Sequence, residues 1–161
     1  LQSRRVTGDI FRAGSVPVTE IRAGIIVGPG CASFEIIRDL VNHLPLMITP
    51  RWVRSKSPPI ALDNLLEYLI GVAQHEEAAG QIYDVAGPEM LSYEELLRQY
   101  GEHVGKHPWI IAVPVLSPRL SSYWLRLITA VPTSTARALI EGLKLHIEAD
   151  DSAIRALIPQ R

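Results

Sequence analysis

The sequence predicts an α/β fold, because strand patterns and helix patterns alternate along the first part of the chain. The strand patterns are apolar runs rich in valine and isoleucine, and the helix patterns carry apolar residues at three- and four-residue spacing. Glycine and proline separate the two kinds of segment. Helix patterns then dominate toward the C-terminus, which indicates the rim of a parallel sheet beside a mainly helical lobe.

The first elements expected along the chain are a helix, a strand and a second helix. Residues 2–14 have apolar residues at helical spacing and end at a glycine. A strand is predicted at 17–22, in an apolar run that enters a glycine- and proline-rich loop at 28–30. The second helix is predicted at 33–44, where Phe34 belongs to an apolar stripe and a proline follows.

The middle of the chain is expected to contain a loop, two strands and two helices. Residues 46–57 have the pattern of a loop that is unusually basic. A short strand at 60–62 precedes a helix that Asp63 caps. A strand is expected at 81–86, and Ser92 begins a helix with a capping box. The last predicted elements are a strand at 109–113 and helices from residue 117, at 133–143 and at 150–157.

Composition and charge exclude several classes of function. The chain has 161 residues, of which 47% are hydrophobic, and a formal net charge of -1. Nucleic acid is not expected as a partner, because phosphate binding needs a basic face. No apolar run approaches the roughly 20 residues of a membrane-spanning helix, so a membrane is not expected as a partner either. The single cysteine, Cys31, is compatible with a reducing cytoplasm, which is the expected location.

Side chains for metal or nucleophilic chemistry do not cluster in the sequence. The five histidines are scattered without the spacing of metal ligands, and no motif of a serine nucleophile is present. Helix capping and the helix dipole explain the adjacent Glu94 and Glu95. The sequence therefore predicts neither a metal site nor a catalytic residue within this chain.

Four segments, taken in order, resemble the short-chain dehydrogenase/reductase superfamily. Residues 22–30, RAGIIVGPG, are similar to the RPGxxYGPG segment after the sixth strand of its extended and atypical members. Residues 59–64, PIALDN, are similar to a short strand that leads into a helix. Residues 80–96 resemble the last sheet strand and its helix, and residues 113–124 resemble a bacterial branch of atypical members. The superfamily includes NAD(P)-binding, sugar-nucleotide-epimerase-like and NmrA-like proteins.

The resemblance implies a partial Rossmann-type sheet, made of its last strands, with a mainly helical substrate-binding lobe. The glycine fingerprint by which the family holds dinucleotide phosphates is not found in these residues. Because the chain also begins with leucine, we expect residues 1–161 to be the C-terminal part of a longer protein. The intact protein would bind NAD or NADP, and this part alone would bind neither.

The resemblance also implies cofactor contacts. Arg4, or alternatively Arg5, falls where the family has the lysine that holds the ribose, and the catalytic tyrosine would precede the chain. Arg22 matches an arginine near the cofactor end of the sheet. The wall of the nicotinamide site would then be shaped by Gly24, Ile25 and Ile26. On the alternative interpretation, Arg4 lies on a solvated helix face and Arg22 pairs with a nearby carboxylate.

Four residues are candidates for substrate contacts: Phe34, Arg51, Trp52 and Arg54. Two guanidinium groups beside an indole can hold a phosphate or carboxylate and stack on a flat ring. Epimerase-like members of the superfamily use basic residues in this general region for a nucleotide diphosphate. The alternative is that this short basic segment is simply solvated.

Two functions are compatible with these observations. The first is the C-terminal portion of an NAD(P)-dependent oxidoreductase or epimerase, inactive alone, whose small-molecule substrate the sequence does not specify. The second is a non-catalytic, NAD(P)-sensing NmrA-like protein or an interaction domain, which the arginine at position 4 favours. In either case, the unpaired edge of a partial sheet predicts a homodimer.

Overall fold

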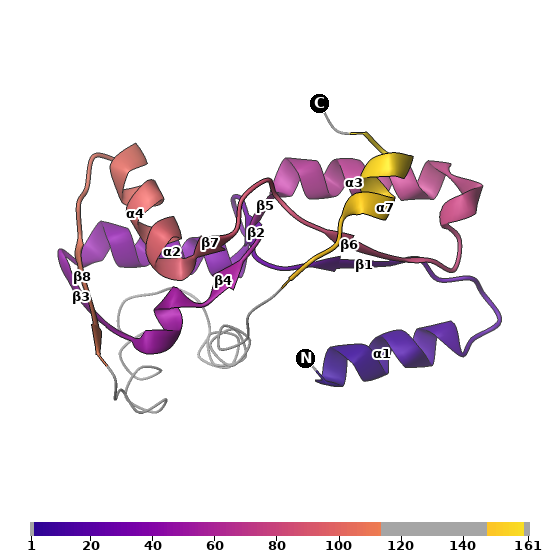
Figure 1. Ribbon diagram of the computed structural model, residues 1–161, viewed down its shortest axis with the longest axis horizontal. Helices are drawn as coiled ribbons and strands as arrows, with labels where there is room; N and C mark the ends of the chain where they lie inside the picture. The colour runs from indigo at the N-terminus through magenta and orange to yellow at the C-terminus, as the bar shows by residue number, and fades with distance from the viewer. Residues whose placement is uncertain (1, 114–147, 160–161) are drawn as a thin grey trace.

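The computed structural model describes residues 2–113 and 148–159, and these form two lobes that a narrow waist connects (Figure 1). One lobe is built around two parallel strands, β1 and β6, and we call it the β1–β6 lobe. The other, the β3–β8 lobe, is built around a second parallel pair. The alternation of helix and strand confirms the predicted α/β class.

The β1–β6 lobe is a two-stranded parallel sheet on which α3 and α7 pack, with α1 leading into it. Its elements are α1 (Gln2–Arg12), β1 (Glu20–Ala23), α3 (Leu62–Gln74), η2 (Glu76–Ala78), β6 (Ile82–Val85) and α7 (Ser152–Leu157). The register pairs Glu20 with Ile82 and Ala23 with Val85. Apolar side chains from α3, β6 and α7 form one core cluster, whose fully buried members include Tyr68 and Ile154.

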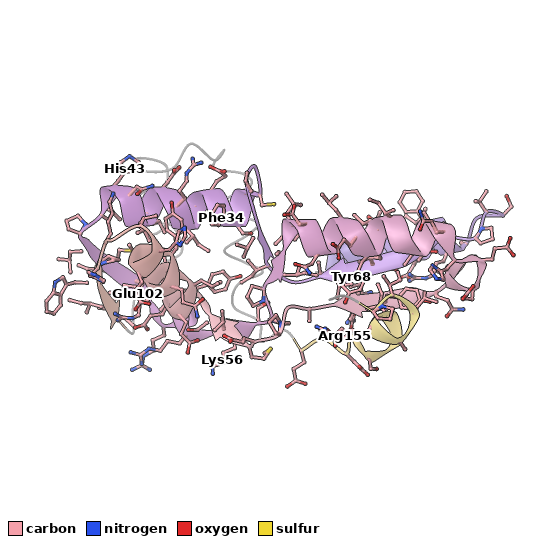
Figure 2. The ribbon with its side chains drawn as sticks, turned by 90° about the horizontal axis from the view of Figure 1, so that it is seen from above. Phe34, His43, Lys56, Tyr68, Glu102 and Arg155 are labelled. Carbon is pink, nitrogen blue, oxygen red and sulfur yellow. The ribbon has the colours of Figure 1, made fainter. Side chains whose placement is uncertain are left out.

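Helix α7 joins the C-terminal segment to this lobe by one buried side chain and one arginine. Ile154 is fully buried against the core. Arg155 Nη2 donates to the carbonyl oxygen of Ala86 at 3.2 Å, and its Nε donates to Asp151 Oδ2 at 2.5 Å. Figure 2 shows Arg155 on the side of α3 that carries Tyr68. Burial raises the pKa of the Tyr68 hydroxyl, while the nearby Arg155 acts in the opposite direction.

The β3–β8 lobe packs two helices on one face of a parallel strand pair. Its elements are α2 (Ala32–His43), β3 (Leu46–Pro50), η1 (Arg51–Arg54), α4 (Tyr93–His103) and β8 (Trp109–Val113). Leu46 pairs with Trp109 and Ile48 with Ile111 in the parallel register. A second core cluster lies between the helices and this pair, and Met47, Ile37, Val41, Leu96 and Leu97 belong to it.

Four short strands form the waist in the centre of Figure 1. Strands β2 (Ile26–Val27) and β5 (Ile60–Ala61) are parallel, whereas β4 (Lys56–Ser57) and β7 (Leu91–Ser92) are antiparallel. Ile25 is buried in the core of the β3–β8 lobe, and its neighbour Ile26 packs against the core of the β1–β6 lobe. Consecutive side chains at the waist therefore contribute to both cores.

Two expectations about the elements are wrong. Residues 46–57, predicted as a loop, contain β3, η1 and β4. Met47 and Thr49 point inward and Leu46 and Ile48 outward, so burial alternates along β3. Apolar and polar residues do not alternate in the same way, and that second alternation is the sequence pattern by which a strand is predicted. The cap of α3 is Ala61 rather than Asp63, because the helix begins directly after β5 and places Asp63 in its first turn.

Other expectations are confirmed with small shifts. The strand predicted at 109–113 is β8, and the helix predicted at 33–44 is α2. The strand predicted at 17–22 is β1, which spans residues 20–23, and the chain changes partner strand after Gly24 to form β2. The helices expected from residue 117 and at 133–143 lie outside the described residues. The helix expected at 150–157 begins at Ser152.

The capping box predicted at Ser92 is confirmed and makes stability depend on pH. The amide and hydroxyl of Ser92 donate to Glu95 Oε2 at 2.6 and 2.7 Å, and these hydrogen bonds lower the pKa of Glu95. Because protonation is easier in the unfolded chain, this stabilisation is complete above the ordinary glutamate pKa of 4.5 and is lost as the pH falls through the lower folded value. We expect Glu95→Gln to reduce the loss of stability in acid.

Urea unfolding of wild type and Glu95→Gln between pH 7 and pH 3 measures this effect. The stability difference between the two should be largest at neutral pH and should shrink as the solution is acidified. Glu102→Gln, a change of an exposed carboxylate on the same helix, is the matched control. A stability difference that stays constant with pH for Glu95→Gln would contradict the interpretation.

Candidate functional site

The candidate site is the waist, because the carboxyl ends of both strands of the β1–β6 lobe lie there (Figure 1). Gly24 follows β1 directly, and Gly87 follows β6 after one residue. In open α/β sheets, ligands bind in the crevice outside the carboxyl ends of the parallel strands. The residues that meet at this point therefore define where a ligand of this fold would be expected.

Two glycines let the chain pack closely at the waist. A Cβ atom on Gly24 would lie 2.6 Å from Ser57 Oγ, and one on Gly87 would lie 1.9 Å from the carbonyl oxygen of Pro59. Both separations are shorter than atoms of these kinds can tolerate. Residues 57–59 therefore contact both strand ends, and we call Gly24, Gly87 and residues 57–59 the waist seam.

Ser57 carries a buried hydroxyl group without a hydrogen-bond partner. The residue is 2% exposed, and among the described residues no group bonds to its Oγ. An unsatisfied buried polar group costs stability, about 1–3 kcal/mol. Sequence reasoning missed this residue, because it lies in the segment predicted as a basic loop.

The predicted cofactor residues have different positions relative to the waist. Arg22 lies within β1, next to its last residue, and its exposed side chain donates from Nε to Glu20 Oε1 at 2.8 Å, so the carboxylate pairing considered above is present. Ile25 is buried, and its carbonyl oxygen accepts from the amide of Ile60 at 2.8 Å. With Ile25 and Ile26 packed into the cores, this segment can offer a ligand mainly Gly24 and backbone. Arg4 lies in α1, which a loop connects to β1.

The predicted substrate residues lie on two elements of the β3–β8 lobe. Arg51, Trp52 and Arg54 share the single turn η1. Phe34, on α2, contacts Tyr100 of α4 edge to face, with ring centroids 5.6 Å apart at 89° (Figure 2). Phe34 is thus partly committed to packing between the two helices.

The η1 arginines are part of a larger cationic group. Arg54 Nε lies 3.5 Å from Glu94 Oε2, and Arg98 Nη2 donates to Glu94 Oε1 at 2.9 Å. Two guanidinium groups therefore share one carboxylate, and Arg51 adds a further positive charge at the start of the same turn as Arg54. Sequence reasoning missed Arg98, although its position four residues after Glu94 is the spacing of a helical ion pair. Exposed pairs of this kind contribute little stability, and such a group can also hold an anion.

The waist combines an unsatisfied buried hydroxyl with a glycine loop whose amide is already engaged. Gly24 packs directly on Ser57, whose hydroxyl is buried and lacks a hydrogen-bond partner among the described residues. The glycine loop that precedes α2 is already engaged, because the amide of Gly30 donates to Glu35 Oε1 at 3.1 Å. A carboxylate thus occupies the place where a phosphate would bind a helix N-terminus.

Two further properties concern the described residues alone. Within residues 2–113 and 148–159, no three histidine, cysteine, aspartate or glutamate side chains are grouped so that they could hold a metal ion. No helix in the same ranges combines the length and the apolar character that crossing a bilayer requires.

Comparisons with known proteins give consistent relatives. No protein-family model matches the chain. The UDP-glucose 4-epimerase of Vibrio cholerae is 28% identical over 108 residues, which are 66% of this chain and 33% of that protein. A nucleoside-diphosphate-sugar epimerase of Staphylococcus aureus has a TM-score of 0.70 at 15% identity, over 97% of this chain and 53% of its own.

A reductase has a similar structure. The triphenylmethane reductase of a Citrobacter species, solved with NADP(H), has a TM-score of 0.63 at 17% identity, over 96% of this chain and 53% of its own. The chain thus spans about a third of the curated relative and about half of the two solved structures. The sequence and the fold agree with the resemblance found in the four segments: this chain is similar in sequence to part of a sugar epimerase and has the Rossmann-like α/β fold of these solved structures.

Proposed function

We propose that this chain is the C-terminal portion of an NAD(P)-dependent oxidoreductase or epimerase and that the waist seam receives the nicotinamide end of the cofactor. The observation that carries the proposal is the buried, unpartnered hydroxyl of Ser57 against Gly24, at the carboxyl end of a parallel strand. Relatives that are sugar epimerases or an NADP(H)-bound reductase support it.

In this proposal each part of the chain has a defined task. The waist seam opens beside Gly24 to admit the nicotinamide ring, and the Ser57 hydroxyl then forms a hydrogen bond with it. Arg51, Arg54 and Arg98 hold an anionic substrate group on the β3–β8 lobe. The bound nicotinamide would supply hydride transfer, and the protein groups of this chain orient the two reactants. Phosphate binding and proton transfer belong to residues outside the chain.

Nucleotide binding by the chain alone tests one part of the proposal. We expect calorimetric titration with NADPH or NADH to give no binding tighter than the high micromolar range, and no turnover, because Glu35 already occupies the amide of Gly30. Nanomolar binding of either nucleotide by the 161-residue chain would contradict this part.

Nucleotide binding by the protein encoded by the full gene tests the other part, which is the role of the waist seam. There we expect Ser57→Ala to weaken NADPH or NADH binding about fivefold, the value of one neutral hydrogen bond, while the free energy of unfolding stays the same or rises. Ser152→Ala, an exposed hydroxyl on α7, is the control. Unchanged affinity would contradict the seam as the site, and affinity and stability falling together would assign Ser57 a structural role only.

The runner-up function is a non-catalytic sensor of NAD(P), similar to NmrA-like proteins. Arg4, at the position where the resemblance implies a lysine, favours it, because arginine stays charged and is a poor proton relay. The residue at the family's tyrosine position in the full gene discriminates the two functions. Tyrosine there favours the enzyme, and an apolar residue favours the sensor. A cytoplasmic location is part of either proposal and rests on the single cysteine.

A further inference from the structure

The C-terminal segment that the structure describes, residues 148–159, returns to the β1–β6 lobe and places helix α7 beside α3 and β6 (Figure 1). A helix of six residues is too short to be stable by itself, so its position depends on packing. Ile154 is fully buried in the core. Ile158 packs on Gly71 of α3 so closely that a Cβ atom there would lie 2.5 Å from Ile158 Cδ1. Apolar contacts therefore fix where α7 lies.

Arg155 extends from α7 to the end of β6. Its Nη2 donates to the carbonyl oxygen of Ala86 at 3.2 Å, across 69 residues of sequence. Asp151, four residues earlier on the same helix, accepts from Nε of this guanidinium and so limits its rotation. The last pair in the β1–β6 register joins Ala23 to Val85, so the carbonyl of Ala86 lies beyond the register. A side chain of α7 thus orients this carbonyl where strand pairing has ended.

The carbonyl of Ala86 leads directly into the waist seam. It shares a planar peptide group with the amide of Gly87, so one cannot turn without the other. Gly87 is the seam residue whose added Cβ would lie 1.9 Å from the carbonyl oxygen of Pro59. A charged donor forms a stronger hydrogen bond than a neutral one. Arg155 therefore holds this peptide group in the orientation that the close approach to Pro59 requires.

The two sides of the waist seam differ in what holds them. On one side Gly24 packs on the side chain of Ser57, and this contact has to open before a ring can reach the buried hydroxyl. On the other side Gly87 packs on the backbone of Pro59. Arg155 acts on this second side, through the peptide group that precedes Gly87. The seam can thus open at Gly24 while its other side keeps its shape.

We propose that Arg155 is a positioning residue for the waist seam: by holding the Ala86 carbonyl it keeps Gly87 in place while the other side of the seam opens for the nicotinamide ring. This inference rests on the proposed function of the seam. Arg155 contacts neither nucleotide nor substrate in this role, and its loss weakens binding because the seam loses its shape. The C-terminal segment, for which the sequence predicted only a helix at 150–157, thus takes part in cofactor binding.

Hydrogen exchange in the 161-residue chain tests the positioning role without any nucleotide. The amide of Ile60 donates to the carbonyl oxygen of Ile25 at 2.8 Å and reports on the seam. Arg155→Met should accelerate its exchange about fivefold. Ile154→Val, which removes one methylene from the same helix and leaves the guanidinium in place, is the matched control and should change this rate less than about twofold. Exchange of the Trp109 amide, in the other lobe, corrects for changes in overall stability.

Nucleotide affinity of the protein encoded by the full gene tests the consequence for binding. Arg155→Met should weaken NADPH or NADH binding about fivefold. Arg155→Lys, which keeps the charge but lacks the planar fork, should weaken it only about twofold, and Ile154→Val should leave it unchanged. In a Ser57→Ala background, Arg155→Met should cost less than about twofold, because the two residues act on the same seam. Circular dichroism verifies that each variant folds.

Three results would overturn the proposal. The first is an Ile60 exchange rate that Arg155→Met leaves unchanged. The second is an equal effect of Arg155→Met and Ile154→Val on exchange and affinity, which would give α7 a structural role only. The third is an affinity that falls with Ser57→Ala but not with Arg155→Met, a result that leaves the proposed function intact. Faster Ile60 exchange in Arg155→Met, with affinity unchanged in that variant and in Ser57→Ala, would instead support the positioning role and overturn the proposed function.

Discussion

Gly87→Ala is expected to destabilise the chain by about 3 kcal/mol or more. The added Cβ would lie 1.9 Å from the carbonyl oxygen of Pro59 and 3.1 Å from its carbonyl carbon. Both are backbone atoms, so no side-chain rotation relieves the contact. The strand end at Gly87 and residues 57–59 would have to separate, and the waist seam would open. Urea unfolding monitored by circular dichroism measures the change.

Gly105→Ala is the matched control for this prediction. Gly105 has φ of 69°, and a Cβ there would meet no atom within 4 Å. Its substitution should therefore cost only the backbone penalty of the left-handed conformation, about 1 kcal/mol. Equal destabilisation by the two variants would show that the close approach at the waist seam is not energetically important.

Met47→Ala is expected to cost about 3 kcal/mol, because Met47 is fully buried in the core of the β3–β8 lobe. Ile48→Ala, one residue further along the same strand, removes a side chain that points outward and should cost less than about 1 kcal/mol. Thermal unfolding of both variants at low protein concentration gives the comparison. Similar losses would mean that β3 does not alternate as described.

An element of this fold could be predicted from the sequence where its own residues carry a recognisable local pattern. The capping box at Ser92 and the strand at 109–113 were predicted correctly, because each has a local pattern that tertiary contacts do not alter. Strand β3 was missed because apolar side chains lie on both faces, Leu46 and Ile48 outward and Met47 inward, so its period of two leaves no trace in the polarity of residues 46–50. Met47 is buried and Ile48 is exposed because α2 and α4 pack on one face of the strand pair and not on the other.

The candidate site was predictable to a lesser extent. The change of partner strand after Gly24 could be expected from a glycine inside an apolar run. The contact of Gly24 with Ser57, and that of Gly87 with Pro59, join segments far apart in the sequence, and no local pattern reports them. The pairing of Arg22 with Glu20 was one of the two alternatives considered, since both carboxylate and guanidinium lie on one strand.

The pairing order of the strands has a consequence for how the chain folds. Strand β1 pairs with β6 and β3 with β8, and in both pairs the partners are about sixty residues apart in sequence. Contacts between residues so far apart in sequence form late, because closing a large loop costs conformational entropy before the contact contributes any stability. During synthesis, β1 and β3 therefore leave the ribosome well before their partners, and nascent chains must keep these strands from aggregating until the second half arrives.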